Sequence, residues 1–305
     1  MSFSDLDSGM DAESETVMGD PVVLAVAIET SRLAAGLVTR HGNVLVRDRV
    51  TTPSRDVWRS LEGLVRRVMA AAPGDVPRPS AIGVSCVGPV DGQAGSVSPP
   101  TVPAWANFPL REHLERLAGR PVVLETAGAA ATEAERWKGE ARDVDSYLCI
   151  RLDSTAESGC VIDGVRLLGA RGNAGSIAHI NVEPDGRPCW CGGRGCLEPY
   201  VSSTLIEAEI NRPLGRANAS IVDRTGIMLG RAIASITATL DVSTVFVSGN
   251  VLDTLGDPLL ESMRRELRLR SRLDSLSGLR VIEPHDRINA VVAAASLVRD
   301  LAVTR

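Results

Sequence analysis

The chain has 305 residues, of which 44% are hydrophobic, 23% charged and only 3% aromatic. This length is typical of two globular lobes, and the hydrophobic content excludes a disordered or fibrous protein. The formal net charge is −5, but six of the 38 acidic residues lie in residues 1–20, where there is no basic residue. The remaining acids nearly balance the 33 bases, so the sequence argues against binding to nucleic acid or to an anionic membrane.

The N-terminal segment and the number of cysteines indicate the cellular compartment of the protein. No apolar run approaches the eighteen or so residues of a membrane span, and residues 1–20 carry acids where a signal peptide carries bases. Six cysteines are too few for a disulfide scaffold in a chain of this size. We therefore expect a cytoplasmic protein with reduced thiols and interpret residues 1–20 as a solvated, disordered acidic tail, with a partner-binding segment as the alternative.

The first half begins with three predicted strands and continues with helices and strands in alternation. His41-Gly42-Asn43 predicts the turn between the second strand and the third, and Thr126 is a suitable N-cap for the last helix. The predicted strands lie at residues 22–28, 33–38, 44–50, 81–87 and 121–124, and the predicted helices at 53–71, 110–117 and 127–137.

The second half repeats this order, which predicts two similar α/β lobes with a cleft between them. Asp163-Gly164 predicts a hairpin turn. We expect strands at 146–152, 159–162, 165–168, 245–248 and 279–282, and helices at 199–210, 222–240, 258–267 and 288–303. The expected N-terminal lobe covers residues 21–136 and is closed by helix 288–303, and the C-terminal lobe covers residues 137–287.

Three cysteines and a histidine lie within eighteen residues. The pattern is His179-x9-Cys189-x-Cys191-x4-Cys196, and three thiolates with one imidazole are a ligand set typical of a closed tetrahedral zinc site. No position is left for water, so such a zinc is structural. The alternative is three free thiols, but the loop has little apolar content to hold it without a metal.

Two segments around this cluster resemble the signature of the ROK family, which comprises bacterial sugar kinases and related repressors. They are residues 172–179 (GNAGSIAH) and 189–198 (CWCGGRGCLE), and weaker matches at 83–91 (GVSCVGPVD) and 105–110 (WANFPL) fall in order. The resemblance implies the actin-like ATPase (hexokinase/ribonuclease-H-like) fold, a nucleotide and a sugar between two lobes, and a dimer. Only about twenty residues precede the first strand, so we expect a divergent member without an N-terminal DNA-binding domain.

The two phosphate-binding hairpins of the family are altered. The first reads approximately D-x-G-G-T-K in the family and Ala27-Ile28-Glu29-Thr30-Ser31-Arg32 here, so the metal-side aspartate has become Ala27. The second reads approximately G-T-G-I-G and is residues 153–157 (DSTAE) here. Glu29 in the first hairpin and the two acids of the second place carboxylates where a triphosphate should lie. At about 4 Å and an effective dielectric near 20, the repulsion between a carboxylate and a phosphate charge costs about 4 kcal/mol, roughly a thousandfold in affinity. The sequence therefore predicts weak binding of Mg²⁺ and ATP.

The segment that carries the family's catalytic base is altered as well. It reads approximately E-N-D-A-N-A-A and aligns with residues 125–131 (ETAGAAA), which places the base at Ala127, where no proton can be accepted. Two sugar-binding residues implied by the resemblance remain, His179, which is also a zinc ligand, and Glu198. A surface carboxylate that caps the following helix is the alternative interpretation of Glu198.

Three nearby acids offer a replacement for the base. Glu125 lies at a strand end where alternation points it away from the cleft, and Glu133 and Glu135 lie along the following helix. We interpret these acids as solvated helix and loop residues instead.

The preferred hypothesis is thus a ROK-family, sugar-kinase-like protein that is catalytically inactive (a pseudokinase) and has a binding or regulatory role. The first alternative is an active ATP-dependent kinase of a hexose or N-acetylhexosamine with a displaced base. The second is a transcription regulator that acts through a protein partner. The expected cofactor is structural zinc, and the expected ligand is a sugar.

Overall fold

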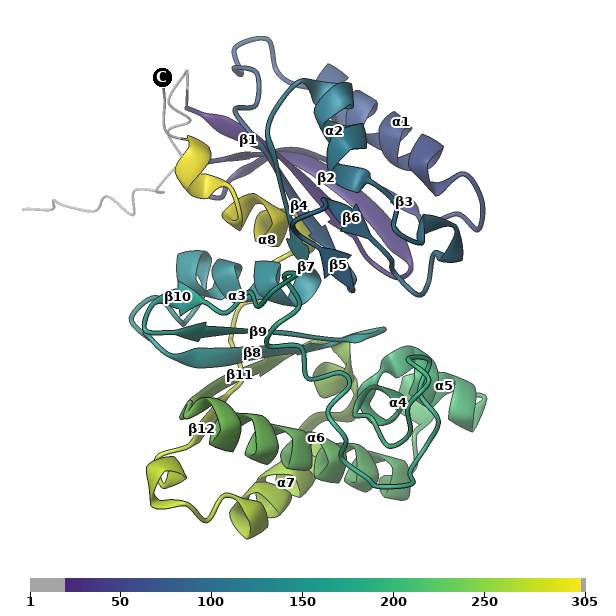
Figure 1. Cartoon of the computed structure of the whole chain (residues 1–305), viewed down its shortest axis with the longest axis vertical. Helices are drawn as coiled ribbons and strands as arrows, with labels where there is room; N and C mark the ends of the chain where they lie inside the picture. Colours follow the sequence, from purple (N-terminus) through teal and green to yellow (C-terminus); the bar gives the residue numbers. More distant parts are fainter. Residues whose placement is uncertain (1–19, 303–305) are drawn as a thin grey trace, which may run out of the picture.

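A computed structural model describes residues 20–302 of the chain. The acidic tail expected at residues 1–20 therefore lies, apart from Asp20, outside the described residues. The described part forms two five-stranded mixed sheets, each flanked by helices, which lie one above the other along the long axis of the molecule (Figure 1).

The first sheet combines a hairpin ribbon with parallel strands. Its strands, in spatial order, are β3 (Val44–Thr51), β2 (Arg32–Thr39), β1 (Val22–Ile28), β4 (Ile82–Cys86) and β7 (Val122–Thr126). Pairs β1–β2 and β2–β3 are antiparallel, whereas β4 is parallel to both β1 and β7. Every residue of β1 is buried, which is typical of a central strand with both faces covered.

Alternate residues of β1 pack against different helices. Leu24 and Val26 share a hydrophobic cluster with residues of α1 (Val57–Ala70) and α2 (Leu110–Ala118). Val23 and Ala25 share another with residues of α8 (Ala290–Ser296). The period-two alternation of the strand thus places an element from the C-terminal end of the chain against the first sheet.

The second sheet repeats the arrangement of the first. Its strands, in spatial order, are β10 (Val165–Arg166), β9 (Ala156–Ile162), β8 (Tyr147–Leu152), β11 (Thr244–Ser248) and β12 (Arg280–Ile282). The strand directions follow the same pattern, with antiparallel β8–β9 and β9–β10 and parallel β8–β11 and β11–β12. The helices α6 (Ala219–Leu240) and α7 (Asn250–Arg270) pack with this sheet in one hydrophobic cluster.

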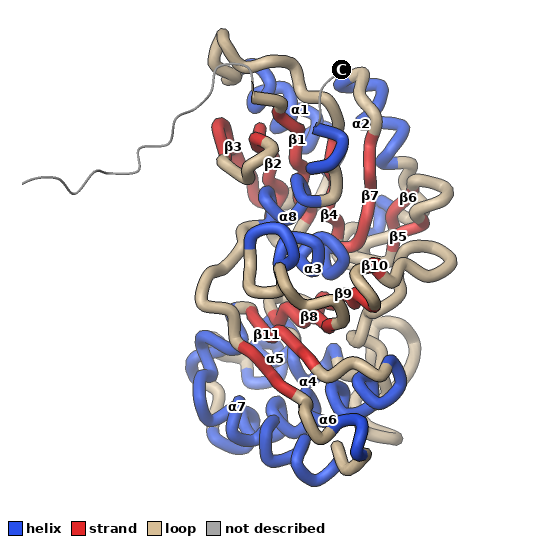
Figure 2. The backbone as a smooth tube through the Cα atoms, turned by 90° about the vertical axis from the view of Figure 1, so that its left-hand side faces the viewer, coloured by secondary structure: helices blue, strands red, loops and turns tan. Residues whose placement is uncertain are grey.

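Helix α3 (Ala127–Lys138) lies between the two sheets, together with α8 (Figure 2). The predicted cap is confirmed, because the Thr126 hydroxyl accepts a hydrogen bond from the N–H of Ala129 at 3.1 Å. Ala130 and Ala134 of α3 pack against Ala293 and Leu297 at the C-terminal end of the chain. Small side chains here let α3 approach both neighbours closely.

Three predicted helices differ from the structure. The helix expected at 199–210 is divided into α4 (Glu198–Val201) and α5 (Ser203–Ile210), because extended Ser202 caps α5 through its side chain. Helix α7 begins well before the expected residue 258 and is kinked at Gly256, where φ is 60°. The closing helix expected at 288–303 is shorter, since α8 ends at Ser296 and a 3-10 turn, η4 (Arg299–Ala302), follows.

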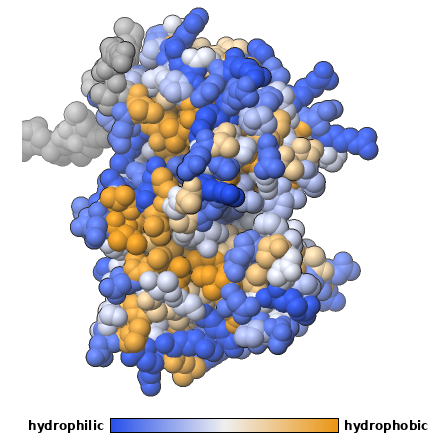
Figure 3. All heavy atoms as spheres, viewed as in Figure 1, coloured by the Kyte–Doolittle hydropathy of each residue, from blue (hydrophilic) through white to orange (hydrophobic). Residues whose placement is uncertain are grey.

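The remaining short elements connect the sheets and helices. They are β5 (Val90–Asp91), β6 (Ser96–Val97), η1 (Pro103–Trp105), η2 (Leu214–Arg216) and η3 (Asp274–Leu276). The surface is hollowed between the two lobes, and hydrophobic residues gather over α3 and α8 (Figure 3). Among residues 20–302, we find no helix that combines the length and the apolar character of a membrane span.

The contact between α3 and β9 gives a first prediction. A Cβ atom on Gly128 would lie 2.0 Å from the backbone oxygen of Ser158, so Gly128→Ala must push the helix away from the strand. We expect a loss of about 1–3 kcal/mol in stability, measured as a lower thermal or urea midpoint. Gly63→Ala is the matched control, since Gly63 lies within α1 with only the tip of Arg67 nearby. It should be neutral or stabilising through helix propensity. Equal midpoints for both variants would contradict the close contact.

Candidate functional site

A cavity of about 440 Å³ lies between the two lobes. Its wall comes from the turn after β4, the N-cap of α3, strand β9, the segment 173–179, the cysteine loop (residues 189–196) and the start of α4. We call this cavity the interlobe pocket. It contains both sugar-binding residues that the sequence predicted, His179 and Glu198, and also Thr126, which directly precedes the predicted base position at Ala127.

Glu198 is a buried carboxyl group in this pocket. Only 3% of the residue is exposed, which excludes the alternative of a surface carboxylate. Burial raises the pKa of Glu198 to about 8, against the effect of the Ala156 N–H, which donates a hydrogen bond of 2.8 Å to one carboxylate oxygen. The second oxygen remains available to a ligand hydroxyl group.

A second carboxyl group, that of Glu157, lies in the same pocket. Burial raises the pKa of Glu157 to about 7, and the Thr155 hydroxyl, the charge of Arg151 and the backbone N–H of Gly128 act in the opposite direction. The Thr155 hydroxyl donates to it at 3.2 Å. The neighbouring residue, Ser158, packs against Gly128, so Glu157 lies near the first turn of α3, which begins at Ala127.

Sequence reasoning treated Glu157 only as a charge that repels phosphate. Strand alternation is the signal that could have indicated more. Ala156 packs in the core of the second lobe, and the Ser158 hydroxyl donates to the Gly175 carbonyl oxygen, so the residue between them faces the other side of β9, toward α3. The missing information was that α3 lies against this face.

The three acids weighed as replacements for the base do not line the interlobe pocket, but they are not solvated either. Glu125, Glu133 and Glu135 are all buried, which corrects the prediction from sequence. Glu125 and Glu133 lie 3.8 and 3.5 Å from nitrogen atoms of Arg166, and Glu135 accepts a hydrogen bond from the Glu140 N–H. Their contacts join α3 to its neighbours.

An arginine connects the two hairpins that resemble phosphate loops. Arg151 of β8 donates to Glu29 in the first hairpin at 3.0 Å and also pairs with Asp153 in the second. Asp153 in turn accepts a hydrogen bond from the Asn250 N–H at 2.8 Å. Two of the three acids on which the predicted repulsion rests, Glu29 and Asp153, are thus paired, whereas no salt bridge of Glu157 is found among the described residues. Together, Arg151, Glu29 and Asp153 carry a net charge of −1.

Asn173 connects the lobes at the pocket itself. Its side-chain oxygen accepts from the Val90 N–H at 2.9 Å, and its side-chain nitrogen donates to the Val90 carbonyl oxygen at 2.7 Å. One amide group thus satisfies both backbone groups of a residue in the other lobe. Sequence reasoning did not identify this role.

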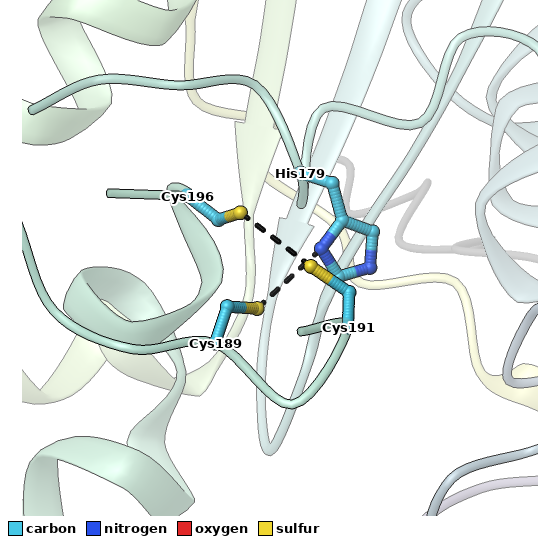
Figure 4. Close-up of side chains that lie close together, drawn as sticks. All are labelled: His179, Cys189, Cys191 and Cys196. Atoms are coloured by element: carbon cyan, nitrogen blue, oxygen red, sulfur yellow. Dashed lines mark hydrogen bonds between the residues drawn. The ribbon is translucent and has the colours of Figure 1, made fainter. Parts of the chain in front are cut away.

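The four predicted metal ligands come together (Figure 4). The ligand atoms of His179, Cys189, Cys191 and Cys196 lie within 4.8 Å of one another. A tetrahedral zinc with bonds of about 2.3 Å to sulfur separates two sulfur atoms by about 3.8 Å. The Sγ atoms of Cys191 and Cys196 are 3.7 Å apart, and Nδ1 of His179 is 3.6 Å from Sγ of Cys189. The donor set and the spacing both fit a closed zinc site.

Comparisons with known proteins agree with this architecture. The ROK family model matches residues 23–300. The glucokinase of Thermotoga maritima is 29% identical over 203 residues, which are 66% of this chain and 63% of that protein. The N-acetylmannosamine kinase of Yersinia pseudotuberculosis is 26% identical over 290 residues, 90% of this chain and 97% of that protein.

A solved structure is similar over nearly the same range. The ROK hexokinase from Thermus thermophilus superposes with a TM-score of 0.76 at 26% identity, covering 90% of this chain and 97% of that one. The predicted fold class, a two-lobed actin-like ATPase fold with a Cys3His loop, is confirmed.

The cluster gives a prediction about metal content. We expect the wild-type protein to carry about one zinc ion per chain and Cys196→Ala to carry much less, because a tetrahedral site has lost one ligand. Mass-spectrometric metal analysis would measure the zinc, and thermal unfolding should show a lower Tm for the variant, by about 2–4 °C for each kcal/mol lost.

Cys86→Ala is the control for removal of a thiol, because Cys86 is buried in the first lobe and belongs to the core there. It should retain its zinc. A zinc-free wild type, or full zinc content in Cys196→Ala, would contradict the assignment.

Proposed function

The chain belongs to the ROK family, and on this basis we propose that it binds a sugar of the hexose class in the interlobe pocket. The observation that carries the proposal is the pair of carboxyl groups in a cavity of about 440 Å³, Glu198, which is buried, and Glu157, which is half-buried. Buried polar groups need hydrogen-bond partners, and sugar hydroxyl groups are donors that suit carboxylates. The relatives named as glucokinase and N-acetylmannosamine kinase support a sugar as the ligand.

We propose that His179, Cys189, Cys191 and Cys196 hold one structural zinc ion. The ion would fix the segment that carries His179 and the start of α4, where Glu198 is the first residue. His179 would therefore have two tasks, one as a metal ligand and one as part of the pocket wall. Zinc bound by four protein ligands has no open coordination position, so its contribution here would be to fix the shape of the pocket wall.

A second candidate function is phosphorylation of the bound sugar, with Glu157 as the base. The position of Glu157 beside Ala127 favours it, as do the kinase names of the curated relatives. In this reaction the hydroxyl proton passes to the Glu157 carboxylate while the oxygen attacks the terminal phosphorus of a nucleoside triphosphate. The bond to the leaving nucleoside diphosphate breaks, and Glu157 later releases the proton to water.

Other observations favour the inactive interpretation over this second candidate. Ala27 cannot help hold a metal ion, and the hairpin side chains occupy positions where bare backbone N–H groups would meet phosphates. The contacts of Arg151 with Glu29 and Asp153 fill the same region. The comparisons favour the active alternative over the inactive interpretation, because the relatives are named as kinases. Direct assays decide between them.

Sugar binding can be tested by calorimetry with a panel of hexoses and N-acetylhexosamines. We expect at least one sugar to bind the wild type. At a pH above about 8, where Glu198 is the charged carboxylate, Glu198→Gln should weaken that binding by about 10- to 100-fold, since a hydrogen bond to a charged acceptor contributes about 1.5–3 kcal/mol. Glu115→Gln makes the same chemical change on the exposed part of α2 and should bind like the wild type. A panel without any binding would refute the proposal.

Phosphoryl transfer can be measured by formation of sugar phosphate from Mg·ATP or polyphosphate. If Glu157 is the base, kcat should rise as the pH increases through about 7, because the carboxylate form accepts the proton. Glu157→Gln should lower kcat by about 10²- to 10⁴-fold with a smaller effect on KM. Glu115→Gln again serves as the control. If the wild type forms no sugar phosphate, the kinase hypothesis is refuted, whereas the proposal of sugar binding is unaffected.

A further inference from the structure

Trp190 is an exposed aromatic residue in the wall of the interlobe pocket. It is 50% exposed and lies between two of the four clustered residues, Cys189 and Cys191. Its ring contacts the His179 ring edge to face, with centroids 4.7 Å apart. A half-exposed tryptophan contributes less to core packing than a buried one. Packing alone therefore does not explain why a tryptophan stands at position 190.

The surroundings of Trp190 restrict its movement. The neighbouring residues on both sides belong to the proposed metal site, and His179 supports the ring. An aromatic side chain that is already ordered loses little conformational entropy when a ligand packs against it. Trp190 therefore offers the pocket a preorganised apolar surface.

The pocket is larger than one sugar ring requires. A pyranose occupies roughly the volume of six waters, about 180 Å³ at about 30 Å³ for each water. The cavity of about 440 Å³ thus has room for about two rings. Its wall combines the carboxyl groups described above with an apolar part, formed by Val87, Pro89, Pro100 and Trp190.

We propose that Trp190 is the stacking surface for a second sugar ring, so that the preferred ligand is a disaccharide of two pyranose rings. The inference rests on the proposed sugar binding and adds a subsite to it. One ring would bind the carboxyl groups through its hydroxyls, as argued for Glu198. The other would place its C–H face on the indole ring, where aromatic and apolar surfaces meet and the hydroxyls at its edge stay in water.

The test compares disaccharides with their component monosaccharides by calorimetry, using maltose, cellobiose and lactose against glucose and galactose. We expect the best disaccharide to bind the wild type about tenfold more tightly than either component, the gain typical of one aromatic stacking contact. Trp190→Ala should remove this gain and leave monosaccharide affinity within about twofold. Trp190→Phe, which keeps an aromatic face, should retain most of it.

Two further measurements separate a ligand contact from a structural role. The zinc content of each variant shows whether the loop is intact, and disaccharide binding should change the tryptophan fluorescence of the wild type but not that of Trp190→Phe. Leu269→Ala removes an exposed apolar side chain from α7, outside the pocket, and should behave like the wild type.

The outcomes distinguish this inference from the proposed function. Equal affinities for disaccharides and monosaccharides, or an unchanged disaccharide affinity in a zinc-loaded Trp190→Ala, would overturn the subsite and leave sugar binding intact. Absence of binding by any sugar would overturn the proposed function itself. If Trp190→Ala loses its zinc, two results still overturn the subsite: equal affinities of the wild type for disaccharides and monosaccharides, or a tryptophan fluorescence that disaccharide binding leaves unchanged.

Discussion

The close packing of α3 against β9 determines how the two lobes meet at the pocket. Because residue 128 has no side chain, the first turn of the helix lies directly against the backbone of Ser158. The same close packing places Glu157, which comes from the other lobe, near the first turn of α3. A larger residue at this position would separate the lobes and move Glu157 away from the helix terminus.

Much of the fold could be predicted from local patterns. The strands, the hairpin turn at Asp163-Gly164 and the Thr126 cap follow from alternation, left-handed residues and side-chain chemistry, all of which act between near neighbours. The four clustered ligands could also be predicted, because their spacing is short. The contact of Glu157 with α3 and the pairing of Arg151 could not, since each depends on how distant elements pack, and residues 29 and 151 are far apart in sequence.

The two halves of the cleft have different electrostatic character. At the hairpins, acids are paired with Arg151 and are about 70% buried, so their charges are satisfied within the protein. In the interlobe pocket, Glu157 and Glu198 lack such an ion-pair partner at hydrogen-bond distance among the described residues, and burial raises the pKa of both. The proposed sugar, an uncharged and hydroxyl-rich ligand, would suit this pocket better than an anion would.

Two of the four clustered residues, His179 and Cys191, belong to the wall of the pocket. The proposed metal and the proposed sugar would therefore contact the same residues. If zinc raises the affinity for the sugar by ordering this loop, the sugar must raise the affinity for zinc by the same factor. If the proposed zinc and the proposed sugar both bind, this linkage would make the zinc concentration a determinant of apparent sugar affinity.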